Sequence, residues 1–288
     1  MQALNQARRQ LRSGHNARIW LLAGALSLTA CILLVWGSWR GLLWSRDYAL
    51  RQIPPAWEAE LGEQAFAEVR KESPLCGSEP LQQALQQALQ QLGQRLQPPD
   101  SPYTLRYSAL RNESINAFAL PGGQIGIHAA LIAKAPGPEA LAGVMAHEAA
   151  HVYAQHGLKS MLGKMGLGLL TLVIFGDMGS VMLALGGMGV GLIGLSFSRA
   201  QETEADAQGL VLLQQAGIDP QGMPAFFSWM QTEEQQAGPA FLSTHPLSAA
   251  RQQSLTQALQ DLPARRFAPL QLDWPALQAA ARDCLKAD

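Results

Sequence analysis

The chain has 288 residues, of which 48% are hydrophobic and 15% charged, so a packed core is possible and disorder over the whole chain is excluded. A formal net charge of −1 excludes a global positive field that would draw the protein to nucleic acid. Three cysteines are too few for a disulfide scaffold. The composition indicates a globular protein with some attachment to a membrane.

The attachment is predicted at the N-terminus. Residues 19–39 carry no charged side chain and are long enough to cross a bilayer core of about 30 Å. Four arginines precede this run, and positive charge stays on the cytoplasmic side of a membrane. We therefore predict a cytoplasmic tail over residues 1–18 and a single transmembrane anchor over residues 19–44. The body then lies in the periplasm, with the anchor in a bacterial inner membrane.

An alternative for the same segment is a lipoprotein signal. The four residues that end at Cys31 read Leu-Thr-Ala-Cys and resemble a lipobox, after which the chain would be cut before Cys31 and acylated there. The chain continues with an apolar run after Cys31, where a lipoprotein normally turns polar, and this favours the uncleaved anchor. Both alternatives place the body on the same side of the membrane.

Two helices are expected to open the body, at Pro55 to Glu72 and Glu79 to Leu96. The second has a leucine stripe at helical spacing, with its glutamines mainly on the other faces. This pattern favours one amphipathic helix that covers a core, and a coiled-coil seam for a partner is the alternative. The stripe consists of Leu81, Leu85, Leu89, Leu92 and Leu96.

A small sheet and an α-rich half should follow. Strands are predicted at Tyr103 to Ser108 and Ile115 to His128, the latter bent at Pro121 to Gly123. The class is therefore α+β, mainly helical, within a domain over residues 45–262 and a helical C-terminal extension over residues 263–288. The further predicted helices are Ala129 to Lys134, Glu139 to Gln155, Ser198 to Ala216, Pro224 to Gln236, Leu247 to Leu259 and Trp274 to Lys286.

Residues 161–197 form a second hydrophobic segment, rich in glycine and methionine. Asp177 interrupts it, and a carboxylate within a bilayer is costly, so two membrane passes are not favoured. We prefer a pair of amphipathic or re-entrant segments that pack on the body or dip into the outer leaflet. A buried glycine-rich hairpin is the alternative.

Cys76 and Cys284 are the two cysteines of the predicted body. In an oxidising compartment they can pair and tie the C-terminal helix to the early one. Two unrelated thiols are the alternative, and the sequence favours neither.

The chemistry-bearing motif is His147-Glu148-Ala149-Ala150-His151 in the predicted helix that starts at Glu139. Four helical residues advance about 400°, so His147 and His151 project from one face and can bind one Zn²⁺. Glu148 is turned away from both histidines and can take a proton from a zinc-bound water. Apolar neighbours in this helix argue against two surface histidines.

A catalytic zinc site needs a third protein ligand and an open position. His156 follows His151 by five residues, well round the helix, and is not expected to be a ligand. Glu202 and Asp206 share a helix face from which Glu204 points away, so Glu202 suits a third ligand and Asp206 an acceptor for a ligand imidazole. A solvated acidic helix start is the alternative for this segment.

Taken together, these motifs resemble the HtpX and CAAX-prenyl-protease family of zinc metallopeptidases, which are zincin-like proteins of the gluzincin type. Residues 116–123, Thr244-His245-Pro246 and Arg251 extend the resemblance, which is nearest to the periplasmic BepA-like and LoiP-like members. The resemblance implies one Zn²⁺ per chain on His147, His151 and Glu202, with Glu148 as the general base. It also implies a regulatory role for His245 as a fourth ligand, with Asp206 and Arg251 near the site.

In this family, an edge strand beside the active-site helix binds the substrate. Here it corresponds to Asn116, Ala117, Phe118 and Ala119, on which an extended chain would add as another strand. We expect a membrane-anchored zinc endopeptidase that acts on misfolded or misassembled envelope proteins. The partners would be unfolded protein and membrane lipid, with no nucleic acid, and homo-oligomers or envelope assembly partners are left open. A chaperone-like zinc protein, or a protease held latent by His245, is the alternative.

Overall fold

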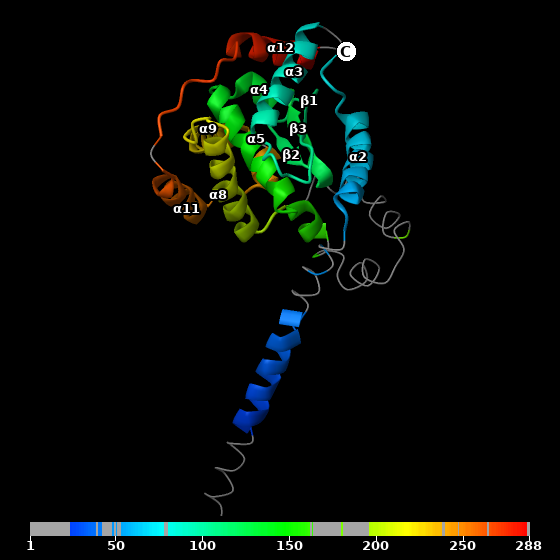
Figure 1. Cartoon of the computed structure of the whole chain (residues 1–288), viewed down its shortest axis with the longest axis vertical. Coiled ribbons are helices and arrows are strands. Elements are labelled where there is room, and N and C mark those ends of the chain that lie inside the picture. Colours follow the sequence, from blue (N-terminus) through cyan, green and yellow to red (C-terminus); the bar gives the residue numbers. More distant parts are fainter. Residues whose placement is uncertain are drawn as a thin grey trace, which may run out of the picture. The chain divides into compact units, whose positions relative to one another are not determined.

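The structure is a computed structural model whose chain forms two compact units, Met1–Arg51 and Gln52–Asp288 (Figure 1). It describes residues 24–38, 40–41, 48, 50, 53–77, 80–161, 163, 180, 196–237, 240–246, 248–263 and 265–286. In the first unit, residues 24–38 are helical and exposed. Within the described ranges, no helix is both long and apolar enough to cross a membrane. Residues 19–23, 39 and 42–44 of the predicted anchor lie outside the described residues, and the anchor stays a prediction.

A three-stranded sheet lies at the centre of the second unit. Its strands are β1 (Arg106–Leu110), β2 (Ala117–Ala119) and β3 (Gln124–His128), in the order β1-β3-β2. β1 pairs parallel and β2 antiparallel with β3. A small sheet among many helices confirms the α+β class. β1 begins three residues later than predicted, because it pairs with β3 from Gln124 onward.

The bend between β2 and β3 is a short 3-10 turn, η1 (Pro121–Gly123). Gly122 has φ +71°, a conformation that side-chain-bearing residues rarely adopt. A Cβ atom there would also lie 2.3 Å from the backbone of Ala59 in α2 (Pro55–Glu72). The glycine therefore serves both the turn and the close packing of α2, which has the predicted bounds.

Glutamines of α3 (Pro80–Arg95) close the outer edge of β1. Gln86 donates to the Ala109 carbonyl at 2.8 Å and accepts from the Ala109 N–H at 3.0 Å. One turn later, Gln90 donates to the Leu105 carbonyl at 3.0 Å and accepts from the Tyr107 N–H at 3.1 Å. These side chains take hydrogen bonds that a neighbouring strand would make, while Leu85, Leu89 and Leu92 enter the core. We call Gln86 and Gln90 the glutamine ladder.

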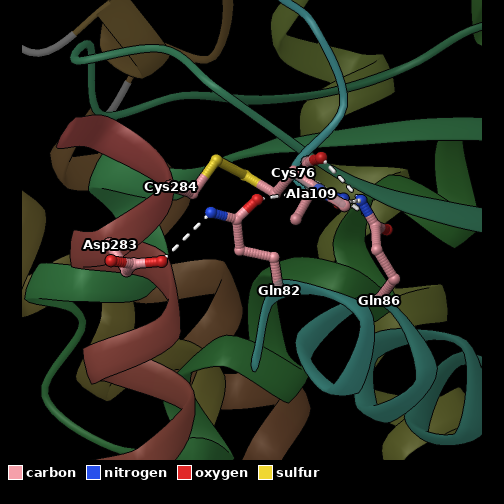
Figure 2. Close-up of a disulfide and its surroundings, with 7 residues drawn as sticks. Cys76, Gln82, Gln86, Ala109, Asp283 and Cys284 are labelled. Carbon is pink, nitrogen blue, oxygen red and sulfur yellow. Dashed lines mark hydrogen bonds between the residues drawn. A yellow bond between two sulfur atoms is a disulfide. The ribbon is translucent and has the colours of Figure 1, made fainter. Parts of the chain in front are cut away.

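A disulfide joins Cys76 to Cys284 in α12 (Trp274–Lys286), so the pairing alternative is confirmed (Figure 2). Beside it, Gln82 accepts from the Gly77 N–H and donates to Asp283 at 3.1 Å (Figure 2). Gln82 is thereby buried at the start of α3. Leu81, predicted in the buried stripe, is instead 45% exposed, because Gln82 takes the buried position there.

The helical half surrounds α5 (Pro138–Tyr153), which is buried along most of its length. Its neighbours are α8 (Arg199–Gln215) and α9 (Gly222–Ala237), while α12 packs on α3 and on α4 (Ala129–Lys134) (Figure 1). The close approach of α5 and α9 needs small residues, since a Cβ on Gly143 would lie 2.6 Å from the backbone of Met223.

The segment before α11 (Ala249–Asp261) differs from the prediction of a single helix from Leu247. A short helix, α10 (Ala240–Thr244), precedes α11, and Ser248 caps α11 by accepting from the Arg251 N–H. The chain therefore breaks between the two helices, around Pro246, whose ring cannot continue a helix interior. Nearly all of the hydrophobic segment 161–197 lies outside the described residues.

Candidate metal centre

Helix α5 supplies the two motif histidines and the glutamate. β2, α8 and α9 cover the helix, so His147 and Glu148 are 0% exposed and His151 is 1% exposed. The imidazole centroids of His147 and His151 lie 4.7 Å apart, as their one-turn spacing predicts. Buried polar groups of this kind need partners to offset their desolvation.

Helix α8 brings the acidic partner. Its start is fixed by a capping box, in which Ser198 accepts from the Gln201 N–H and the Gln201 side chain accepts from the Ser198 N–H. One residue later, Glu202 is 1% exposed and turned toward α5. The alternative of a solvated acidic helix start is therefore wrong for Glu202.

Four side chains converge on one point. Among the described residues, ligand atoms of His147, His151, Glu202 and His245 all lie within 4.8 Å of one another. His147 Nε2 lies 3.0 Å from His151 Nε2 and 3.2 Å from His245 Nδ1, and Glu202 Oε1 lies 3.4 Å from His151 Nε2. In a zinc tetrahedron with bonds of 2.0–2.1 Å, ligand atoms lie about 3.3–3.4 Å apart. The donor set and its spacing therefore fit Zn²⁺.

Glu148 lies beside this cluster without joining it. Both of its carboxylate oxygens are buried and accept no hydrogen bond from a described residue. The His245 Nε2 atom is 3.5 Å from Glu148 Oε1, too far for a good hydrogen bond. Burial raises the pKa of this carboxylate. A buried carboxylate whose oxygens accept no hydrogen bond is available to take a proton.

Asp206 and Arg251 form the outer contacts of His147. The His147 Nδ1 atom lies 2.9 Å from Asp206 Oδ1, so this carboxylate lies directly against the ring. Arg251 in α11 donates to both Asp206 oxygens, at 2.6 and 2.8 Å, and its Nη1 is paired with Glu202. Arg251 therefore links the two carboxylates of α8.

Burial and pairing act in opposite directions on the acidic groups. Burial alone would raise the pKa of Glu202. The charge of His245 and hydrogen bonds from His151 and His245 instead lower this pKa well below its usual range. Burial would likewise raise the pKa of Asp206, but hydrogen bonds from Arg251 and His147 lower it. Burial lowers the pKa of His151 well below its usual value. These shifts favour the anionic forms of Glu202 and Asp206 and the neutral form of His151.

His156 departs from the expectation that it points away. Its Nδ1 lies 2.9 Å from Nδ1 of His151, and its Nε2 lies 3.3 Å from Oε2 of Glu204. The side chain is 0% exposed. Glu204 thus faces His156 rather than only solvent. Both contacts were missed from the sequence. They depend on the end of α5 at Tyr153 and on φ +53° at Gln155, and the helical pattern of the sequence predicts neither.

His245 enters the centre from the chain that follows α10. Its ring stacks on Phe241 with centroids 4.4 Å apart, and its Nδ1 lies 3.0 Å from Glu202 Oε1. Phe197 stacks on His151 at 4.0 Å, and its N–H is bonded to the Thr244 carbonyl. Aromatic rings therefore hold His245 within the cluster.

The predicted substrate strand lies at the edge of the sheet opposite the glutamine ladder. Asn116 precedes β2 and accepts from the His128 N–H, while residues 117–119 pair with β3. Ala117 and Phe118 are buried and Ala119 is half-buried. The Phe241 N–H is bonded to the Ile115 carbonyl, so α10 lies against the chain that leads into β2.

A comparison with protein families matches residues 79–259 to the model described as peptidase family M48. The chain belongs to peptidase family M48. The family resemblance inferred from the motifs is therefore confirmed, and with it the prediction of a metallopeptidase at the level of the family.

Two curated relatives show the range of similar proteins. The beta-barrel assembly-enhancing protease of Escherichia coli K12 is 33% identical over 208 residues, which cover 67% of this chain and 42% of the relative. The mitochondrial metalloendopeptidase OMA1 of Schizosaccharomyces pombe is 33% identical over 180 residues, which cover 59% of this chain and 52% of the relative. The chain thus matches about half or less of each relative's length.

Proposed function

We propose that this M48 protein is a zinc endopeptidase whose ligands are His147, His151 and Glu202. The observation that carries the proposal is the buried cluster of these side chains beside Glu148, whose oxygens accept no hydrogen bond from a described residue. Zinc held there would supply a polarised water and stabilise the charge that develops on the scissile carbonyl. Glu148 accepts the proton of the attacking water and later returns it to the leaving amine.

The substrate strand is proposed to lie along the outer edge of β2. In an antiparallel pair, alternate residues direct their backbone groups away from the partner strand. Asn116 and Leu120 bond to β3, so Ala117 and Ala119 direct their N–H and C=O groups outward. Main-chain pairing reads little side-chain identity, which supports unfolded or misassembled proteins as substrates.

Metal removal tests this proposal. Treatment of the full-length chain with a zinc chelator should lower casein cleavage at least about 100-fold, because the ion supplies several kcal/mol of transition-state stabilisation. Added Zn²⁺ should restore the rate, and metal analysis should find about one zinc per chain before treatment. Casein cleavage that persists after complete zinc removal would contradict the proposal.

The second candidate function is a protease that is held latent, and the position of His245 favours it. Four protein ligands leave no open position for water. The same short segment, residues 240–245, also carries the hydrogen bond from Phe241 to Ile115 beside β2. We infer that withdrawal of this segment frees the fourth position and uncovers the substrate strand together. A chaperone-like zinc protein would keep the segment in place.

His245→Ala should therefore raise casein cleavage by about tenfold or more, which corresponds to about 1.4 kcal/mol favouring the closed arrangement. Zinc content should stay near one per chain, because three ligands remain. The variant is compared with Phe267→Ala, which changes a partly exposed ring outside the site. A fall in cleavage with zinc retained would mean that His245 assists catalysis rather than restraining it.

The cellular setting is part of the proposal. A disulfide between Cys76 and Cys284 supports an oxidising compartment such as the periplasm. The charge pattern around residues 19–44 supports an inner-membrane anchor, with acylation at Cys31 as the alternative. Misassembled envelope proteins are then the proposed substrates, in keeping with the name of the Escherichia coli relative. Contacts of residues 161–197 with lipid, and homo-oligomers, belong to the same proposal.

A further inference from the structure

The backbone at Gln155 changes where the next side chain points. In a continuous helix, five residues advance 500°, so His156 would lie about 140° around the axis from His151. Instead α5 ends at Tyr153 and Gln155 takes φ +53°; it is the one residue other than glycine with positive φ in the described ranges. Helical structure resumes at residue 156. The interruption turns His156 back toward His151.

Buried contacts hold this unusual backbone in place. The Gln155 side chain donates to Oε1 of Glu58, which also accepts from the Tyr103 hydroxyl at 2.9 Å. Glu58 is 1% exposed and lies on α2. On the other side, the Gln201 side chain of the α8 capping box donates to the His156 carbonyl. Residues from two other helices therefore hold the backbone that places His156, as expected for a conformation that costs free energy by itself.

The hydrogen-bond roles along this chain of rings are determined by the proposed ligand. His151 directs Nε2 at the cluster, so as a neutral zinc ligand it must carry its proton on Nδ1. Nδ1 of His156, 2.9 Å away, must then accept that N–H. His156 consequently carries its own proton on Nε2, which faces Oε2 of Glu204 at 3.3 Å. In this arrangement the His151 N–H faces an acceptor nitrogen of His156, and the His156 N–H faces the carboxylate of Glu204.

We propose that His156, supported by Glu204, is a positioning residue that fixes the tautomer and ring orientation of the zinc ligand His151. The inference rests on the proposed zinc site. It makes the two ligand histidines unequal. His147 contacts a buried carboxylate directly, whereas His151 is linked only through the neutral ring of His156 to a carboxylate that is 46% exposed. His156 itself binds no metal in this assignment.

The test is the zinc dissociation constant of the full-length chain, measured by competition with a chelator well below the unfolding temperature of each variant. His156→Ala should raise the constant about 10- to 100-fold, the usual effect of removing such a partner. His156→Asn should restore it to within about threefold of the wild type, since the Asn Oδ1 can accept where Nδ1 did. Glu204→Ala, a surface change that leaves the core intact, should raise it about threefold.

His128→Ala is the matched control, because His128 is also buried but is bonded to Ser114 away from the cluster. It should lower the unfolding temperature without changing the zinc dissociation constant. Wild-type affinity in both His156→Ala and Glu204→Ala would show that His156 only fills space, and overturn the inference. Equal losses in His156→Asn and His156→Ala would overturn the role of the acceptor. Absence of zinc from the wild type would instead overturn the proposed function.

Discussion

A chain carrying Glu148→Gln should cleave casein about 10²- to 10⁴-fold more slowly than the wild type while it binds the same amount of zinc. The amide keeps the size of the carboxylate but cannot take a proton from the attacking water. Because Glu148 contributes no atom to the ligand cluster, zinc content should stay at about one per chain. The measurement pairs casein digestion with metal analysis on the same samples.

The comparison is repeated in the His245→Ala background, where we expect the highest rate and the widest range for detecting the loss. Glu60→Gln, an exposed glutamate on α2, is the matched control and should cleave at the wild-type rate. Equal cleavage by wild type and Glu148→Gln would mean that another group is the base. A loss of zinc in Glu148→Gln would assign the residue to the metal site instead.

Removal of the disulfide is the second large effect that we expect. The double variant Cys76→Ala with Cys284→Ala should lose about 2–5 kcal/mol of stability, because the bond closes a loop across 208 residues and restricts the unfolded chain. For a domain of this size, the unfolding temperature should fall by about 5–15 °C. Thermal unfolding of the full-length chain, followed by circular dichroism, measures this change.

Two comparisons keep the disulfide experiment specific. Cys31→Ala changes an exposed free cysteine and should leave the unfolding temperature unchanged. A reductant should lower the unfolding temperature of the wild type toward that of the double variant and should not affect the double variant further. A double variant as stable as the wild type would show that α12 is held by its packing on α3 and α4 alone.

Local signals in the sequence were sufficient for much of the fold. α2, α4 and α12 have the predicted bounds, and α5 and α8 lie within one or two residues of them, because prolines, caps and apolar spacing mark their ends. The proximity of Glu202 to the motif histidines was also predictable, because a catalytic zinc site needs a third ligand and Glu202 shares a helix face with Asp206. The α+β class followed from the same elements.

Features that depend on contacts between distant segments were not predictable in this way. His156 reaches His151 because Gln155 adopts a backbone conformation that Glu58 in another helix helps to hold. α10 was missed because a helix of 5 residues is too short to carry a clear helical pattern. The pairing of Cys76 with Cys284 was left open, since spacing along the chain says nothing about distance in the fold.

The glutamine ladder has a consequence for the behaviour of the protein in solution. A protein that recruits unfolded chains by strand pairing risks pairing with them, or with its own copies, at every free sheet edge, and such growth leads to aggregates. Gln86 and Gln90, together with the chain around Leu75, occupy outer hydrogen-bonding groups of β1, so this edge is closed to a further strand. Under the proposed function, capture would then be restricted to β2, beside the metal centre, where a bound chain would be cut rather than extended.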